Sequence, residues 1–227
     1  MQRRIITTAD GSTTIQIEDW NEQYHSIHGA IQEAKHVFIK HGLHTIQTQE
    51  LSILEIGFGT GLNAFITLLE AEKLHKHIHY VGVEAYPVTT DELEHLNYIS
   101  QLKAETHADD FQNIHAVTWG VAHPITPHFT LTKQLKQFKD ITDTEAFDLI
   151  YFDAFGARVQ PELWTEAIFK IMFDALKPHG ILVTYAAKGS VRRAMLSVGF
   201  TVEKLQGPPG KREMLRARKG SEHSANL

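Results

Sequence analysis

The chain has 227 residues, of which 42% are hydrophobic and 22% charged, and it contains no cysteine. This length and composition are typical of one soluble domain built around a single core. The absence of cysteine excludes disulfides, thiol nucleophiles and cysteine-based zinc sites, and it fits a reducing compartment. No apolar signal core lies near the N-terminus, and no apolar run approaches about 18 residues. We therefore expect a cytoplasmic protein that is neither secreted nor inserted in a membrane.

Positive charge is concentrated near the carboxyl end of a chain whose formal net charge is −5. Between Tyr185 and Gly220 there are nine Lys or Arg residues and two Glu residues, so this segment carries +7 and the remainder −12. A basic end on an acidic body suits contact with a polyanion such as RNA. A solvated basic tail without a partner explains the same pattern equally well.

The first 48 residues differ in pattern from the rest of the chain. Residues 3–19 alternate in polarity around Asp10-Gly11 and predict a β-hairpin with a primed turn. Apolar residues at helical spacing predict a helix over residues 21–43, with Gly42 near its end. We expect residues 1–48 to form an extension packed on a core domain over 49–220, followed by a flexible tail over 221–227.

From residue 51 onward, strand patterns alternate with helix patterns. Thr89 or Thr90 can cap the helix expected over residues 91–102, and Pro161 lies in the first turn of the helix expected over residues 161–176. Such alternation predicts a mostly parallel sheet covered on both faces, that is, a three-layer α/β sandwich. The expected strands are 51–59, 78–87, 128–133, 147–155 and 180–187, and the final segment 200–219 is expected to form an antiparallel hairpin. The expected helices are 62–74, 91–102, 133–141, 161–176 and 190–199.

The segment "SILEIGFGTGLNAF" (52–65) places three glycines where a predicted strand turns into a helix. Open α/β folds bind ligands at this end of the sheet, and glycine lets a ligand approach the backbone closely. The dinucleotide fingerprint requires a third glycine at the position of Leu62, so this loop departs from it. A glycine-rich turn without a ligand remains the alternative. The pattern of this loop is Glu55-x-Gly57-x-Gly59-x-Gly61. It resembles motif I of the class I S-adenosylmethionine (SAM)-dependent methyltransferases.

A second acidic residue supports a nucleoside site. Glu84 ends the predicted strand in "YVGVEAYP", 23 residues after Gly61. A carboxylate at this place can accept hydrogen bonds from both ribose hydroxyls of a nucleoside. Glu84 could hold the ribose of NAD equally well, so only the glycine spacing favours SAM over a nicotinamide cofactor.

Asp153 and Phe155 stand at the end of another predicted strand, in "YFDAFGARVQPELW" (151–164). Methyl transfer to an amine needs a neutral lone pair in line with the sulfonium methyl, whereas an alkylamine has a pKa of about 10. A carboxylate can hold the amine and take up its proton, while an aromatic side chain excludes water. We predict these roles for Asp153 and Phe155; capping of the next helix is the alternative role of Asp153.

Four stretches, over 24–39, 54–65, 151–164 and 185–217, resemble the MnmC-like methyltransferase domain of bacterial tRNA modification. The resemblance covers about residues 20–218 and implies a Rossmann-like class I fold with a mostly parallel seven-stranded sheet. It implies SAM-dependent methylation of the primary amine of 5-aminomethyl-(2-thio)uridine at the tRNA wobble position, giving the 5-methylaminomethyl nucleoside. Many members carry a fused FAD-dependent oxidoreductase that prepares the amine. This chain resembles the stand-alone methyltransferase, so we expect no flavin, no metal, and a separate enzyme that supplies the substrate.

The resemblance also assigns cofactor-binding residues. Glu84 should hold the ribose, and Asp153 and Phe155 should face the amine. The place of Asp153 at the end of a central strand also puts it beside the bound cofactor. Family members often carry Gly-Asp where this chain has "FTLTKQLKQF", so the candidate for the adenine contact is Trp119-Gly120. Periodicity alone would make the upstream segment an amphipathic surface helix. The resemblance instead places four residues of this segment near the cofactor: Tyr24, His25, Ser26 and Glu33. The residues that it places around the methionine part of the cofactor are Glu55, Gly57, Phe58, Gly59, Thr60, Gly61 and Asn63.

The implied substrate gives the basic end a use. The wobble base lies in a single-stranded loop, so an aromatic side chain such as Phe155 or Trp164 can stack on the uracil without opening a duplex. Basic side chains would line the approach of the anticodon-loop backbone. The candidates for these contacts are Lys188, Arg192, Arg193, Lys211 and Arg212.

Other readings of the sequence stay open. Fifteen histidines, among them His75, His77 and His79, raise a metal site, but no second ligand cluster accompanies them and we expect no metal. A nicotinamide oxidoreductase fits the glycine spacing less well. An aminopropyltransferase of the spermidine synthase type would share the sheet. A methyltransferase for another amine and a cofactor-retaining RNA-binding module without turnover are the remaining alternatives.

Overall fold

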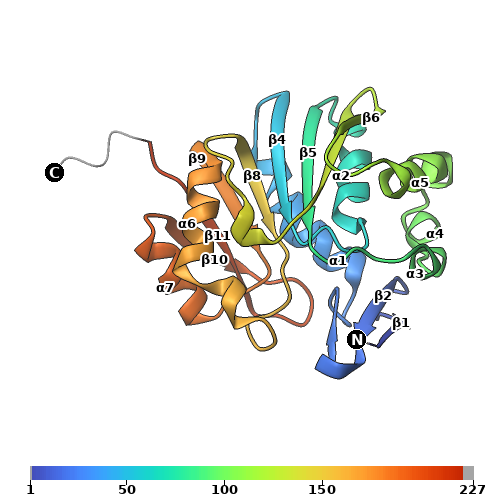
Figure 1. The fold of residues 1–227 in the computed structure, drawn as a ribbon, viewed down its shortest axis with the longest axis horizontal. Helices are drawn as coiled ribbons and strands as arrows, with labels where there is room; N and C mark the ends of the chain where they lie inside the picture. The colour runs from blue at the N-terminus through green and yellow to red at the C-terminus, as the bar shows by residue number, and fades with distance from the viewer. Residues whose placement is uncertain (1, 222–227) are drawn as a thin grey trace.

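Two β-sheets organise the computed structural model, which describes residues 2–221. The small sheet consists of β1 (Arg3–Thr7), β2 (Thr13–Ile17) and β3 (Glu22–Gln23), all antiparallel. It lies beside the carboxyl ends of the central strands of the large sheet (Figure 1). The predicted tail, apart from Ser221, lies outside the described residues.

The large sheet has a parallel centre and antiparallel edges. Its parallel strands are β4 (Glu50–Ile56), β5 (His77–Glu84), β7 (Phe129–Leu135), β8 (Phe147–Phe152) and β9 (Leu176–Thr184). One edge is β6 (Ala122–Thr126), and the other is the hairpin of β10 (Thr201–Gln206) and β11 (Glu213–Arg218). The strand order is β10-β11-β9-β8-β4-β5-β7-β6, so the order reverses at β4, where open α/β sheets bind ligands.

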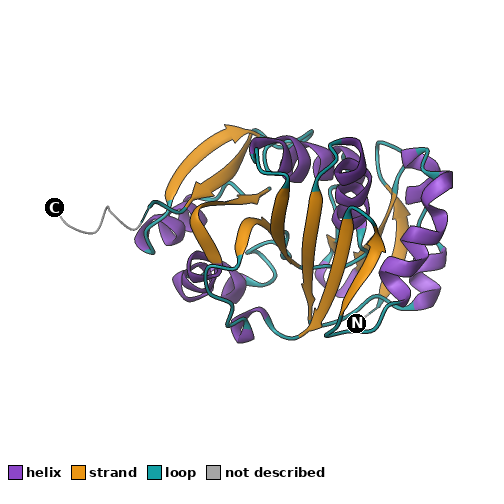
Figure 2. Cartoon of the chain, turned by 90° about the horizontal axis from the view of Figure 1, so that it is seen from above, coloured by secondary structure: helices purple, strands orange, loops and turns teal. Residues whose placement is uncertain are grey.

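Helices cover both faces of this sheet (Figure 2). One face carries α1 (Ala30–Ala34), α2 (Leu62–Lys73) and α5 (Ala108–Ala116), with the short helices α3 (Thr90–Glu94) and α4 (Tyr98–Leu102) beside them. The other face carries α6 (Glu166–Ala175) and α7 (Gly189–Ser197). This arrangement confirms the predicted three-layer α/β sandwich.

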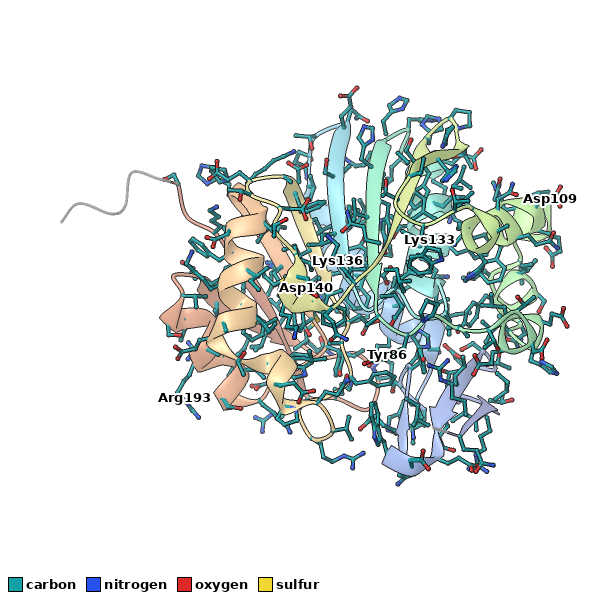
Figure 3. The ribbon with its side chains drawn as sticks, viewed as in Figure 1. Tyr86, Asp109, Lys133, Lys136, Asp140 and Arg193 are labelled. Atoms are coloured by element: carbon teal, nitrogen blue, oxygen red, sulfur yellow. The ribbon has the colours of Figure 1, made fainter. Side chains whose placement is uncertain are left out.

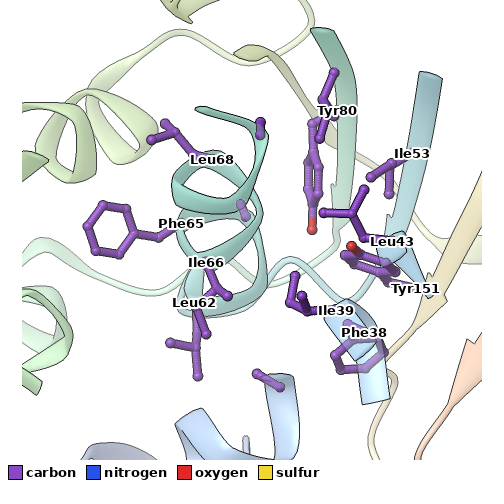
Figure 4. Close-up of a cluster of buried hydrophobic side chains, with 14 of the residues drawn as sticks. Phe38, Ile39, Leu43, Ile53, Leu62, Phe65, Ile66, Leu68, Tyr80 and Tyr151 are labelled. Atoms are coloured by element: carbon purple, nitrogen blue, oxygen red, sulfur yellow. The ribbon is translucent and has the colours of Figure 1, made fainter. Parts of the chain in front are cut away.

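The core consists of two hydrophobic clusters, one on each face of the sheet. Ile53 and Tyr80 belong to the cluster that packs against α2 (Figure 4). Leu54 and Ile150 belong to the opposite cluster, which includes α6 and α7. Neighbouring residues of a strand point to opposite faces, and residues 53–56 of β4 and 149–152 of β8 are all buried, so these strands are covered on both sides. Central strands buried in this way give the site at their ends a rigid floor.

The N-terminal extension differs in detail from the prediction. The hairpin forms, but residues 8–12 make a five-residue loop closed by a hydrogen bond from Thr8 N to Ser12 O (2.8 Å), so the primed turn was wrong. The carboxylate of Asp10 accepts hydrogen bonds from Ser12 N and Gln32 N and joins this loop to α1. The predicted helix over 21–43 begins only at Ala30, because residues 22–23 pair with β2. A π-helix, Lys35–Lys40, continues it.

The core domain also departs from the prediction in the middle of the chain. The sheet has eight strands instead of seven, since β6 was not predicted; its sequence "AHPIT" contains a proline and lies at an edge. The predicted helix over 91–102 is split into α3 and α4, with Thr89 capping α3 through a capping box. Residues 133–135 belong to β7, so only a short 3₁₀ turn, Phe138–Asp140, remains of the predicted helix 133–141.

Candidate active site

A cavity of about 740 Å³ lies at the carboxyl ends of β4, β5 and β8. This volume suits a nucleoside cofactor together with part of a substrate. Aromatic side chains form much of its wall, and acidic side chains from three strand ends reach into it. These acidic residues are Glu55, Glu84 and Asp153.

The glycine loop bends sharply over the end of β4. Gly57 has a φ of +88°, and a Cβ there would lie 2.7 Å from the carbonyl oxygen of Asp153. The amides of Gly57 and Phe58 both donate to the carbonyl oxygen of Val83 (3.1 Å each), which ties the loop to β5. Gly59, with a φ of +50°, faces the ring of Tyr24. Only glycine fits this path without strain, which explains the spacing seen in the sequence.

Glu84 is held by three backbone amides. Its Oε2 accepts from Gly59 N (3.0 Å), and its Oε1 accepts from Ala85 N (2.9 Å) and Tyr86 N (2.8 Å). The carboxylate also lines the cavity, so lone pairs remain for hydroxyl donors. This geometry fits a ribose-binding acid at the end of β5.

Asn63 links two carboxyl groups at the floor of the cavity. Its Nδ2 donates to Glu55 Oε1 (2.9 Å) and to Asp153 Oδ2 (2.8 Å). Burial raises the pKa of Glu55 well above its ordinary value, with Asn63 acting in the opposite direction. Burial, and then the nearby carboxylate of Glu33, raise the pKa of Asp153 to about 7, while Asn63 and Lys211 lower it. Asp153 can therefore exchange a proton near neutral pH.

Three aromatic rings line the same cavity as Asp153. Phe155 packs edge-on against Tyr24 (ring centroids 4.9 Å apart) and against Trp20 (5.7 Å), and all three rings line the cavity. Trp20 was not predicted; it ends a short 3₁₀ turn, Glu18–Trp20, just before the stretch 24–39 that carried the resemblance. Trp164 is buried and donates its indole N–H to the carbonyl oxygen of Phe155 (2.8 Å). In this structure Trp164 supports Phe155 from behind, and its ring does not line the cavity.

The upstream residues divide between the cavity wall and the layer behind it. Tyr24 and His25 line the cavity, and burial lowers the pKa of His25 to about 4. Ser26 and Glu33 lie behind, where Ser26 N donates to Glu33 Oε1 (3.1 Å). Of these residues only Glu33 is helical, so the predicted helical position of the other three was wrong. Thr60 also lies behind, where its hydroxyl accepts from the phenol of Tyr98 (3.0 Å).

The candidate adenine residues lie away from the main cavity. Trp119 lines a second cavity of about 560 Å³ on the α5 side of the glycine loop, and Gly120 faces open space. The residues beside Glu84 in the main cavity instead follow the ends of β5 and β7, which are neighbouring strands. Tyr86 is prominent among them and lies near the small sheet (Figure 3). Sequence reasoning missed this set, which is Tyr86, Gln137, Phe138 and Lys139.

The basic candidates divide into free and paired side chains. Lys188, Arg193 and Arg212 are exposed, and Arg193 points outward from α7 (Figure 3). Arg192 is half-buried, and Lys211 forms an ion pair with Glu33 (Nζ to Oε2, 2.6 Å). Part of the positive charge of the carboxyl end is therefore balanced inside the protein. Further pairs in this segment are Lys204–Glu213, Arg216–Glu203 and Lys219–Glu145.

Residues 2–221 show neither a metal-binding cluster nor a membrane-spanning helix. Within that range no group of three or more His, Asp or Glu side chains could hold a metal ion. The same range holds no helix with the length and apolar character that a membrane span requires.

Comparison with known proteins places this geometry in a family. A family model described as S-adenosyl-L-methionine-dependent methyltransferase matches residues 128–220. The tRNA 5-methylaminomethyl-2-thiouridine biosynthesis bifunctional protein MnmC of Burkholderia thailandensis is 30% identical over 211 residues, covering 86% of this chain and 32% of that protein. MnmC of Burkholderia mallei (strain SAVP1) is 32% identical over 213 residues with the same coverage. The chain thus spans about a third of the length of these curated relatives.

Solved structures show the same fold. MNMC2 from Aquifex aeolicus aligns with a TM-score of 0.78 at 23% identity, covering 97% of this chain and 71% of that chain. Spermidine synthase from Thermotoga maritima aligns with a TM-score of 0.53 at 14% identity, covering 96% of this chain and 73% of that chain. At these identities the likeness concerns the fold alone.

The fold, the glycine loop and the family model define a SAM-dependent methyltransferase with the class I α/β architecture. Within this class, the chain is similar to the methyltransferase part of the MnmC proteins, the resemblance that its sequence motifs predicted.

Proposed function

We propose that this chain uses SAM to methylate the primary amine of 5-aminomethyl-(2-thio)uridine at the wobble position of tRNA, in the cytoplasm. The observation that supports it best is Asp153 beside Phe155 in the cavity that also holds the glycine loop and Glu84. Residues 49–220 would act as the catalytic domain, and residues 1–48 would supply part of the cavity wall through Trp20 and Tyr24. The cofactor, when bound, supplies an electrophilic methyl group on sulfur.

The protein's own residues would position and deprotonate the amine. Glu84, which lines the cavity, would accept hydrogen bonds from the ribose, and the glycine loop would let the methionine part approach the backbone. Asp153 accepts a proton from the substrate ammonium and leaves a neutral amine with a free lone pair. Its pKa of about 7 allows this transfer near neutral pH. The lone pair of the neutral amine would then be free to accept the methyl group that the cofactor supplies, with the demethylated cofactor as the other product.

Phe155, Tyr24 and Trp20 would enclose the reacting groups and exclude water. An aromatic wall also offers a face on which the uracil can stack. Methyl transfer from SAM to an amine needs neither an oxidant nor a metal ion. A separate enzyme would supply the aminomethyl group.

The test is incubation with methyl-labelled SAM and bulk tRNA from cells that cannot complete this modification, followed by nucleoside analysis. We expect label in 5-methylaminomethyl-(2-thio)uridine. Cofactor binding without label in tRNA would point to another amine, and tRNA binding without any transfer would point to an RNA-binding module. Decarboxylated SAM in a parallel reaction tests aminopropyl transfer, for which we expect no product.

A further inference from the structure

The tip of the C-terminal hairpin reaches the back of the active site. Residues 207–211, between β10 and β11, pack so closely on the extension that a Cβ at Gly210 would collide with the ring of His28. His36 in the π-helix also hydrogen-bonds the carbonyl oxygen of Gln206 (2.8 Å). This packing brings Lys211 to Glu33, which lies 178 residues earlier in the chain.

The Glu33–Lys211 ion pair is tightly built. Lys211 Nζ lies 2.6 Å from Glu33 Oε2, and Glu33 Oε1 accepts from Ser26 N. The side chain of Glu33 is only 8% exposed and that of Lys211 is 32% exposed. Lys211 Nζ also lies 3.9 Å from the centre of the Tyr185 ring, a cation–π distance. A lysine held in this way is poorly placed to meet an RNA phosphate.

Tyr185 connects the pair to the loop that carries Asp153. Its phenol donates to the carbonyl oxygen of Ala154 (2.8 Å), the residue next to Asp153. Neither Glu33 nor Lys211 lines the cavity, so both act on the reacting groups only through Asp153 and its loop. The negative charge of Glu33 raises the pKa of the Asp153 carboxyl group, and the positive charge of Lys211 lowers it.

We infer that Glu33 and Lys211 are positioning residues, which set the orientation and the charge state of Asp153 from behind the cavity. This inference rests on the proposed role of Asp153 as the base of methyl transfer. It removes Lys211 from the expected RNA-binding set. It also assigns the C-terminal hairpin a role in the chemistry, in addition to closing the sheet.

Charge removal from the two partners should act in opposite directions. Lys211→Met leaves the Glu33 carboxylate uncompensated and should raise the pKa of Asp153, whereas Glu33→Gln should lower it. The other polar groups that face Asp153 or its loop, Asn63 on α2, Glu55 on β4 and Tyr185 after β9, stay the same in both variants. We expect shifts of about half a pH unit or more in each direction.

The first readout is the titration of the Asp153 carboxyl carbon, followed by NMR in protein labelled at aspartate, with Asp153→Asn to assign the signal. This measurement needs no substrate, so it stands even where methyl transfer to tRNA fails. Opposite shifts in the two variants are the expected result. An Asp153 midpoint that is the same in wild type and both variants would overturn the inference.

The second readout is the pH profile of kcat/KM for methyl transfer. The acidic limb should move upward for Lys211→Met and downward for Glu33→Gln, with little change in tRNA affinity. A loss of salt-dependent tRNA affinity in Lys211→Met with an unmoved profile would return Lys211 to the RNA surface and overturn the inference. Where Lys211→Met fails to fold, Lys211→Gln replaces it.

The same hairpin provides a matched control. Lys204 and Glu213 form an exposed ion pair (3.0 Å), and neither residue lines the cavity. Lys204→Met and Glu213→Gln make the same charge changes and should leave the Asp153 midpoint and the pH profile in place. Shifts in these controls equal to those of the test variants would attribute the effect to net charge and contradict the inference.

Discussion

Asp153 joins two properties that a base for a protonated amine requires. It lines the cavity, and burial together with Glu33 raises its pKa to about 7. An ordinary surface carboxylate, with a pKa of about 4, would be too weak a base to take a proton from an alkylammonium group. The hydrogen bond from Asn63 fixes the orientation of one carboxylate oxygen and leaves the other for the substrate.

Asp153→Asn should therefore abolish most of the methyl transfer while the cofactor still binds. We expect kcat to fall by about 10²- to 10⁴-fold, the usual contribution of general base catalysis. Calorimetry with SAM and single-turnover transfer to tRNA separate the two effects. Asp109→Asn, at an exposed position of α5 away from the site (Figure 3), should keep wild-type turnover. Near-normal kcat in Asp153→Asn would exclude a role for its carboxylate in the reaction.

The raised pKa of Asp153 also predicts a pH dependence of stability. In the unfolded chain this carboxyl group ionises near its ordinary value of 3.8, whereas in the folded protein it does so near 7. Between these two values the folded state binds more protons, so its stability falls as the pH rises. The slope from this group is at most about 1.4 kcal/mol per pH unit.

Urea unfolding of wild type and Asp153→Asn from pH 4.5 to 7.5 measures this linkage. The variant lacks the ionising group, so its free energy of unfolding should rise relative to wild type as the pH increases. A constant difference between the two proteins across this range would show that the pKa of Asp153 is not raised in the folded state.

At the scale of elements, the glycine loop shows how a local pattern encodes a site. The sequence predicts a strand, a sharp turn and a helix at residues 51–74, and the structure has β4, the loop and α2 there. Gly57 is required because its backbone lies against the carbonyl group of Asp153, at the end of the neighbouring strand β8. The loop therefore sets the distance between its own backbone, the proposed cofactor contact, and Asp153, the proposed base.

Gly57→Ala should disturb both the loop and Asp153. The new Cβ would meet the Asp153 carbonyl oxygen at 2.7 Å, and its φ of +88° strains any residue but glycine. We expect a loss of stability of about 1–3 kcal/mol and a lower affinity for SAM, measured by chemical unfolding and calorimetry. Gly199→Ala also sits at a positive φ, +106°, but its Cβ would meet Phe173 only at 3.4 Å. That variant should keep SAM affinity; an equal loss in both would mean that backbone strain alone, without the contact to Asp153, explains the effect.

Elements with strong local signals were predictable from the sequence, and those set by distant partners were not. The strands of the parallel sheet, the Thr89 cap and the terminal hairpin all follow from periodicity and capping rules. The extension departs from its helical pattern because residues 22–23 find partners in β2, which periodicity does not reveal. The indole ring of Trp164 could stack on a base, but the sequence around it does not show whether the ring faces the cavity or the core, where the structure places it.

The same limit applies to charged residues. Glu33 and Lys211 each read as a binding residue when taken alone, and only the fold shows that they pair. The acids at the strand ends were predictable, since the carboxyl ends of parallel strands meet at one edge of the sheet.

At the scale of the whole molecule, the free basic side chains share an edge with the active site. Lys188 follows the carboxyl end of β9, and Arg193 lies one turn further along α7. Arg212 precedes β11, whose first residues lie beside the end of β9 because these strands are antiparallel. These three exposed residues replace the wider set expected from the sequence as the proposed contact for the anticodon-loop backbone.

Charge reversal of Lys188, Arg193 and Arg212 to Glu should weaken tRNA binding at least about tenfold near physiological salt, because phosphate contacts become repulsive. The slope of log affinity against log salt should become shallower by about 2, as expected when about three contacts to a single-stranded region are lost. Affinity for SAM should stay the same, since none of the three lines the cavity. A control variant reverses three other exposed lysines, Lys35, Lys40 and Lys103, and makes the same change in net charge. If the control weakens tRNA binding equally, tRNA affinity depends on net charge and not on a defined surface. Lys188, Arg193 and Arg212 would then not form the contact for the anticodon loop.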